Sequence, residues 1–302
     1  MRRRRLLSQL TPASRFCTIH AYEPYPGSLN RKRLKRSLTL LERVTPLKFK
    51  NILLKKKNRL AEITINRPPL NILDIETLME LNKALKHVKK DKDLSVVIIR
   101  AAGERAFSAG VDIKDHLPEK IDELLENFHE VFFSLIDLNI PTIAVVDGYA
   151  LGGGCELAAA CDMVIASEKS QFGQPEINAG VFPTVAAPLF PKLIGRKKAF
   201  ELILTGNRIN AKEAEMIGLV NRVVPGEKLE ATVNELANNL KRKSPIVLRL
   251  ARTAIHRGFD LEFRKGLANV TDVYLGLLMN TEDSKEGLRA FLEKRKPVWK
   301  GK

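Results

Sequence analysis

Two glutamates among apolar residues are the side chains of this sequence best suited to acid–base chemistry. Glu156 follows three consecutive glycines and precedes the apolar run 157–160, and Glu176 comes twenty residues later, directly after Pro175. A buried carboxylate is costly unless it is used or paired, and burial raises its pKa toward the range useful for proton transfer. Two such groups beside one water would polarise it and pass protons in both directions. Taken singly, each glutamate is equally well explained as a helix-terminus or a solvated loop residue.

Two segments of small residues offer backbone N–H groups rather than side chains. Gly152, Gly153 and Gly154 stand between an apolar stretch and a predicted helix, where backbone comes close to a ligand and free N–H groups point outward. Such donors stabilise an oxyanion as it forms. No Gly-Lys-Ser/Thr follows, which excludes a phosphate-binding P-loop. The segment 105–113 is also rich in small residues and would let a flat group lie on the backbone. Tight packing or an ordinary turn explains either segment equally well when each is taken alone.

Apolar periodicity from about Leu47 onward predicts the elements that position these residues. A β-hairpin is expected from Phe49–Leu54 and Leu60–Ile65 around a basic turn, and a helix capped by Asp74 follows. Further strands are expected at Leu94–Ala101, Thr142–Val146 and Met163–Ala166. A helix is expected at Pro118–Asp137 and a short helix from the glycines to about Cys161. The segment Phe172–Ala179 is expected to be irregular. Beyond Pro188 helices dominate, and a lone strand is expected among them at Val220–Val224. The expected helices are Lys197–Leu204, Ala211–Ile217, Lys228–Lys241, Ile246–Arg257, Leu261–Leu278 and Glu282–Lys294. The pattern is an α/β body followed by a helical C-terminal third.

The strongly basic character of the chain is concentrated at its N-terminus. The net charge is +16, and residues 1–50 hold 13 Lys and Arg against two acids, which leaves about +5 for the remaining residues. Residues 1–45 lack apolar periodicity and resemble a mitochondrial presequence, or else a disordered extension. The charge therefore describes this segment and not the site. The sequence has no apolar run long enough to predict a membrane-spanning helix.

Cysteine usage predicts a reducing compartment. The three cysteines, Cys17, Cys155 and Cys161, form neither a CxxC pair nor a metal-ligand spacing, so no disulfide framework or metal site is expected. None of the five histidines has a partner motif, and all are interpreted as structural or surface residues. We expect a cytoplasmic protein, or a mitochondrial matrix protein if residues 1–45 are a presequence.

Three segments together resemble the crotonase (enoyl-CoA hydratase/isomerase) superfamily. Phe107–Lys114 is similar to its first oxyanion segment, Gly148–Ala158 to its second, and Phe172–Ile177 to its second acidic motif. The resemblance runs from about Phe49 to Lys300. It implies an α/β fold. After the basic extension 1–45, residues 46–250 would form a crotonase-like ββα spiral, and residues 251–302 a helical trimerisation region.

The resemblance implies a role for each matching position. It assigns the backbone N–H groups of Val111 and Gly153 to an oxyanion hole for a thioester, and Glu156 and Glu176 to the pair that holds the catalytic water. It assigns a further set to coenzyme A binding: Ala106, Ser108, Ala109, Gly110, Asp112, Ile113, Phe291 and Lys294. No metal or other cofactor is needed, because coenzyme A is part of the substrate. A homotrimer or a dimer of trimers is implied.

The implied activity is hydration of the 2,3 double bond of an enoyl-CoA thioester through an enolate. Relatives that only move a double bond commonly keep one of the two glutamates, whereas hydration normally uses both, and both are present. In one segment, Pro183–Pro188, glycines typical of hydratases are replaced by bulkier residues, as in relatives that hydrate cyclic dienoyl-CoA esters. Cyclic dienoyl-CoA hydration and double-bond isomerisation therefore stay open as alternatives. RNA binding, known for one branch, has only the basic N-terminus in its support, so nucleic acid is not the expected partner.

Overall fold

The computed structural model describes residues 48–260, 263–276 and 278–298. From Phe49 onward, the described residues form one compact unit. The predicted segment 1–45 lies outside the described residues. The predicted boundary between the spiral core and the trimerisation region, at residues 250 and 251, falls inside one helix, α9 (Pro245–Asp260). The division of the chain into an extension, a core and a trimerisation region stays a prediction. Within the described ranges, each helix is too short or too polar to cross a membrane.

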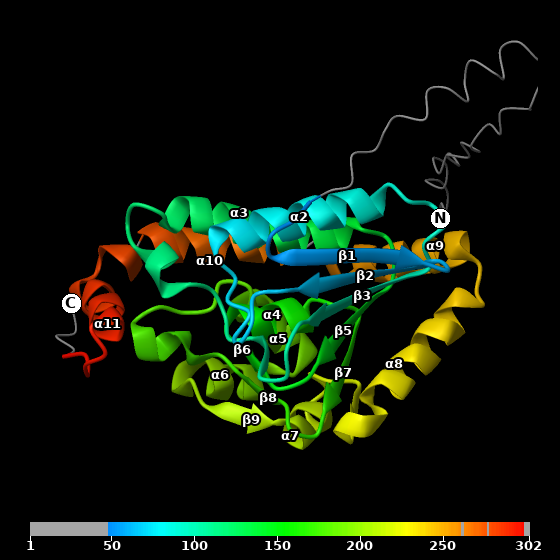
Figure 1. Ribbon diagram of the computed structural model, residues 1–302. Coiled ribbons are helices and arrows are strands. Elements are labelled where there is room, and N and C mark those ends of the chain that lie inside the picture. The colour runs from blue at the N-terminus through cyan, green and yellow to red at the C-terminus, as the bar shows by residue number, and fades with distance from the viewer. Residues whose placement is uncertain (1–47, 261–262, 277, 299–302) are drawn as a thin grey trace, which may run out of the picture. The chain divides into compact units, whose positions relative to one another are not determined.

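A six-stranded sheet forms the centre of this unit (Figure 1). Its strands run in the order β1 (Ile52–Lys57), β2 (Leu60–Ile65), β3 (Val96–Ala101), β5 (Thr142–Val146), β7 (Met163–Ser167) and β10 (Arg222–Val224). The predicted hairpin of β1 and β2 is antiparallel, and every other pair is parallel. The strand predicted at Val220–Val224 is confirmed as β10, which pairs with β7 at the sheet edge. It is not the lone strand beyond Pro188, however, because β9 (Arg208–Asn210) precedes it.

The hairpin turn is shorter than its run of lysines indicates. Strand β1 continues through Lys57, and only Asn58 and Arg59 form the turn, with φ of 51° and 63°. A two-residue hairpin turn of this kind requires positive φ at both positions, and asparagine tolerates it well. The basic residues of β1 are therefore exposed strand residues and not loop residues.

The large sheet separates two apolar clusters, as the alternation of side chains along a strand requires. Val97 and Ile99 of β3 belong to the main core, which includes residues of α2 (Ile75–Lys89) and α3 (Ile121–Asp137). Val96 and Ile98 point the other way, against α8 (Gly226–Lys241). As predicted, Asp74 caps α2, its Oδ1 accepting from the Thr77 N–H at 2.9 Å.

A second sheet, which the sequence pattern did not predict, lies beside the first. It consists of β4 (Ala106–Ser108), β6 (Tyr149–Leu151), β8 (Gln171–Gly173) and β9 (Arg208–Asn210). Strands β3, β5 and β7 of the large sheet are each followed by one strand of the small sheet and then by helical structure. This repeated ββα unit is the predicted spiral. Three-residue strands are too short for a period of two to be recognised, so the prediction that 172–179 is irregular was wrong for its first residues.

The remaining helices follow the predicted order, with one addition. They are α4 (Gly153–Ala159), α5 (Ala186–Leu193), α6 (Arg196–Thr205), α7 (Ala211–Met216), α9, α10 (Phe263–Gly276) and α11 (Glu282–Leu292). Helix α5 was not predicted, because prolines normally break helices. Pro188, however, falls in its first turn, where an N–H has no partner inside the helix. This added helix reaches the candidate site.

Candidate active site

Glu156 is buried in the first turn of α4, with 1% of its surface exposed. Its Oε1 accepts two hydrogen bonds, from the Val185 N–H at 2.8 Å and the Ala186 N–H at 2.6 Å. Both donors belong to the start of α5, so free N–H groups at a helix terminus hold the carboxyl. Burial raises the pKa of Glu156 to about 7, although these two hydrogen bonds act in the opposite direction. Glu156 therefore changes its charge near neutral pH.

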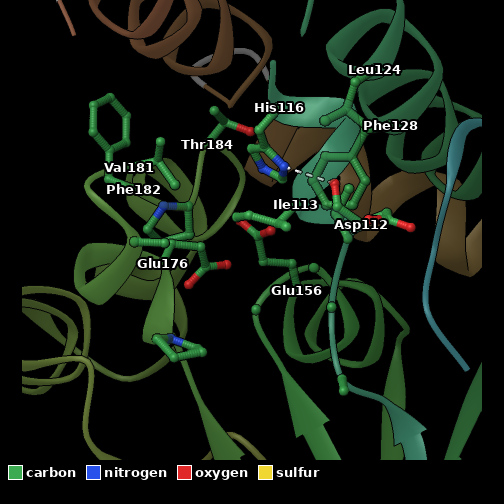
Figure 2. A pocket seen from close by; sticks show the side chains of 18 of the residues that line it. Asp112, Ile113, His116, Leu124, Phe128, Glu156, Glu176, Val181, Phe182 and Thr184 are labelled. Atoms are coloured by element: carbon green, nitrogen blue, oxygen red, sulfur yellow. Dashed lines mark hydrogen bonds between the residues drawn. The ribbon is translucent and has the colours of Figure 1, made fainter. Parts of the chain in front are cut away.

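Glu176 lies opposite, on the 3-10 segment η2 (Pro175–Ala179), and is half-buried. Burial raises its pKa well above the usual range, and the charge of Glu156 raises it further. Figure 2 shows the two carboxyl groups pointing into the same space. A Cβ on Gly152 would stand 2.7 Å from Glu176 Oε1, so glycine at this position allows the carboxyl to reach the start of α4. Mutual repulsion and burial favour a pair that holds one proton between them.

Two backbone N–H groups lie together at the edge of this space. Gly153 is the first residue of α4, so its N–H has no acceptor within the helix. The Val111 N–H has no acceptor among the backbone hydrogen bonds of the described residues. A Cβ on Gly110 would lie 3.7 Å from the Gly153 nitrogen, and one on Gly153 would lie 2.7 Å from Val111 Cγ2. The two predicted oxyanion-hole residues are therefore direct neighbours, although they are 42 positions apart in the sequence.

A cavity of about 420 Å³ brings these groups together. Nine of the twelve predicted site residues line it: Ala109, Gly110, Val111, Asp112, Ile113, Gly153, Glu156, Glu176 and Phe291. Its remaining lining is mostly apolar, with Leu124 and Phe128 on one side and Val181 and Phe182 on another (Figure 2). An apolar cavity with a few convergent polar groups is the usual form of a small-molecule site.

Three residues predicted to bind coenzyme A do not line the cavity. Ala106 and Ser108 are buried in β4. The Ala106 carbonyl accepts from Asn71 Nδ2 at 2.7 Å, and Ser108 Oγ accepts from the Gly110 N–H at 3.1 Å. Ser108 therefore supports the turn that carries Gly110, whereas Ala106 ties β4 to Asn71. Lys294 is exposed beyond α11.

Gln174 and His116 are site residues that sequence reasoning did not single out. With its amide nitrogen turned toward Glu176, the fully buried Gln174 donates to both carboxylate oxygens, at 3.1 and 3.2 Å. Its position two residues before Glu176 was the available signal. His116 lines the cavity, and its Nδ1 lies 3.0 Å from the Asp112 carbonyl, which leaves Nε2 as an acceptor (Figure 2).

The described residues contain no cluster of three or more His, Cys, Asp or Glu arranged to hold a metal ion. The groups that converge on the cavity, two carboxyls with raised pKa and a pair of N–H donors, are suited to proton transfer. The expectation that no cofactor is required stays a prediction.

Comparisons with known proteins identify a matching family and similar chains. A family model described as enoyl-CoA hydratase/isomerase matches residues 55–302. A "Probable enoyl-CoA hydratase, mitochondrial" of Dictyostelium discoideum is 41% identical over 254 residues, which are 82% of this chain and 90% of the relative. A "Short-chain-enoyl-CoA hydratase" of Clostridium acetobutylicum is 38% identical over 257 residues, 83% of this chain and 97% of the relative.

Solved structures with similar folds carry related descriptions. An enoyl-CoA hydratase from Mycobacterium avium subsp. paratuberculosis aligns with a TM-score of 0.76 at 29% identity, over 83% of this chain and 99% of the other. An enoyl-CoA hydratase from Bacillus anthracis aligns with a TM-score of 0.68 at 37% identity, over 84% of this chain and all of the other.

Proposed function

The chain belongs to the enoyl-CoA hydratase/isomerase family and hydrates enoyl-CoA thioesters, and we propose that Glu156 and Glu176 carry the proton transfers of this reaction. One observation carries the proposal. Two carboxyls with raised pKa point into one apolar cavity beside two N–H groups that have no backbone acceptor. Hydration needs a group that accepts a proton and a group that donates one, and a pair sharing one proton supplies both.

The two glutamates take different roles in the proposed reaction. The N–H groups of Val185 and Ala186 favour the ionised form of Glu156, whereas the pKa of Glu176 is raised further by its neighbour's charge. Glu156 therefore accepts the proton of the attacking water, whose oxygen bonds to C3 of the substrate. Glu176 donates a proton to C2. The N–H groups of Val111 and Gly153 bind the thioester oxygen, whose negative charge grows as the enolate forms; donors of this kind contribute a factor of ~10²–10³ each.

Substitution of each glutamate by glutamine tests this assignment. Glu156→Gln and Glu176→Gln should each lower the kcat of crotonyl-CoA hydration by at least ~10²-fold, with little change in coenzyme A affinity. The double variant should be far less than multiplicatively worse, because both residues act on one water. Glu119→Gln is the matched control, since Glu119 is exposed and outside the cavity.

Two results would contradict the assignment in different ways. Full hydration by Glu156→Gln would exclude the pair as the water-binding site. Lost hydration with retained double-bond migration would make Glu176 the sole proton carrier, and isomerase the better description.

The aromatic lining of the cavity favours a flat acyl group as a candidate substrate. Phe182 and Tyr274 stand edge to face, with ring centroids 5.0 Å apart, and both line the cavity with Phe128. The glycine-free segment 183–188 borders the same region. Comparing kcat/KM for crotonyl-CoA with that for a cyclic dienoyl-CoA ester tests this: a higher value for the ring would support the narrower substrate class, and a much lower value would exclude it.

For coenzyme A, we propose that the cavity-lining residues Ala109, Asp112, Ile113 and Phe291 contact the cofactor portion of the substrate. Lys294 lies two residues beyond the helix that contains Phe291, and would place a positive charge near the phosphates of coenzyme A. Lys294→Ala should raise KM for the coenzyme A ester and leave kcat unchanged.

A homotrimer is proposed from the exposed apolar face of α9. Four of its residues have 60–73% of their surface exposed: Ile246, Val247, Leu250 and Ile255. Several large apolar side chains exposed on one helix are typical of subunit interfaces. Light scattering should give a trimer or hexamer for the wild type and a smaller species for Leu250→Glu, with Lys228→Glu on α8 as the control.

The compartment depends on residues 1–45. A mitochondrial location is supported by their basic composition and by the name of the Dictyostelium relative, which is described as mitochondrial. Fusion of residues 1–45 to a fluorescent reporter tests it, because a cytoplasmic signal would exclude a presequence role.

A further inference from the structure

A buried threonine, immediately before the two donors that hold Glu156, is hydrogen-bonded to a buried histidine. Thr184 has 3% of its surface exposed and lines the cavity, and His129 of α3 has 8% exposed. His129 Nε2 and Thr184 Oγ1 are 2.9 Å apart. Burying an imidazole and a hydroxyl is costly unless they bond to each other or to other groups. This bond therefore ties the segment before α5 to a helix on the other side of the cavity.

The two residues after Thr184 are the donors that hold Glu156. The Val185 and Ala186 N–H groups both donate to the same oxygen, Oε1, at 2.8 and 2.6 Å. Because the three residues are consecutive, the orientation of the Thr184 backbone constrains the direction of these two N–H groups. The carboxyl of Glu156 is held in place through this backbone.

We propose that His129 and Thr184 are positioning residues, which set the place of the Glu156 carboxyl through the N–H groups of Val185 and Ala186. The role rests on the proposed function, in which Glu156 accepts the proton of water. A misplacement on the order of 1 Å at such a group costs up to ~10²-fold in rate. A bond that fixes the donors of Glu156 therefore acts on turnover and not on substrate affinity.

The environment of His129 fits this role. Burial lowers its pKa to about 4, so the ring is neutral at physiological pH. A neutral imidazole bonds to the hydroxyl without placing a positive charge near the glutamate pair, and leaves the electrostatics of that pair unchanged. Its ring also lies beside Phe128, with ring centroids 6.2 Å apart, in the helix face that borders the cavity.

Two nearly isosteric substitutions at Thr184 test the proposal. Thr184→Val removes the hydroxyl and should lower kcat about tenfold, with KM changed less than about twofold. Thr184→Ser keeps the hydroxyl and should retain more than about a third of the wild-type kcat. In the Glu156→Gln background, Thr184→Val should cause no further fall, because its effect passes through Glu156.

Substitutions at His129 provide the second arm if Thr184→Val does not fold. His129→Leu should lower kcat as Thr184→Val does, and the combination should be no worse than either alone. His129→Gln, whose amide can bond to the hydroxyl, should restore most of the activity.

The outcomes separate this role from the proposed function. Full kcat in Thr184→Val or His129→Leu would overturn the positioning role alone. The role would also be overturned if Thr184→Val lowered kcat by the same factor in the Glu156→Gln background as in the wild type. The substitution would then act generally on folding or packing and not through Glu156. Full turnover of Glu156→Gln by itself would overturn the proposed function and this role with it.

Discussion

Replacement of Glu156 by glutamine should stabilise the fold at alkaline pH while it removes activity. Burial raises the pKa of Glu156 from 4.5 to about 7. When the pKa of a group is higher in the folded than in the unfolded protein, its protonation stabilises the fold. This contribution to the unfolding free energy is complete below the pKa of the unfolded state and is lost as the pH rises through the pKa of the folded state. For Glu156 this window lies between 4.5 and about 7. Above it, the wild type carries the complete cost of a buried negative charge, and the glutamine variant carries none.

The magnitude follows from the size of the shift. One pKa unit corresponds to about 1.4 kcal/mol, so the shift from 4.5 to about 7 corresponds to about 3 kcal/mol at alkaline pH. The charge of Glu156 is also one cause of the raised pKa of Glu176. Its removal lowers that pKa toward the ordinary value, which adds to the effect in the same direction.

Urea unfolding at about pH 5 and about pH 8 measures this difference. The free energy of unfolding of Glu156→Gln, relative to wild type, should increase by about 2–3 kcal/mol between the two conditions. Comparing the two pH values cancels the fixed effect of the substitution, and a constant protein concentration removes the contribution of assembly. Glu119→Gln is the control and should show no such change with pH. A relative stability of Glu156→Gln that is the same at both pH values would refute the reasoning.

Three further predictions concern other parts of the site and fold. Gly153→Ala would bring a Cβ to 2.7 Å from Val111 Cγ2, so steady-state kinetics should show at least a ~10-fold lower kcat. Arg252→Ala removes a buried guanidinium that donates to Asp162 Oδ2 at 2.7 Å and to the Leu135 and Ile136 carbonyls at 2.8 and 2.9 Å. It should lower the unfolding free energy by about 2–4 kcal/mol in urea titrations, because three hydrogen bonds of a buried charged group are lost. Cys161, whose pKa burial raises to about 12, should be alkylated only after unfolding, as peptide mass spectrometry can test.

Local chemistry pointed to the chain segments that form the site, although only their combination, through its resemblance to a known family, assigned a role to each. The glycines before Glu156, the proline before Glu176 and the small residues around Gly110 each mark backbone that approaches a ligand or turns sharply, and these signals are contained within a few residues. The strands of the large sheet were likewise predicted, because β3 and β5 are continuous apolar runs. His129, by contrast, was interpreted as an ordinary structural residue, since its partner Thr184 is 55 positions away.

Tertiary structure decided what these residues do. The donors to Glu156 come from a helix 29 and 30 positions later, which its prolines concealed in the sequence. The raised pKa of both glutamates is caused by burial and by their proximity, and neither exists in an isolated segment. The sequence by itself determined which groups are available and the order in which the chain presents them. Desolvation and hydrogen bonding depend on neighbours that only the packed ββα units bring together, and for this reason the structure alone decided their chemistry.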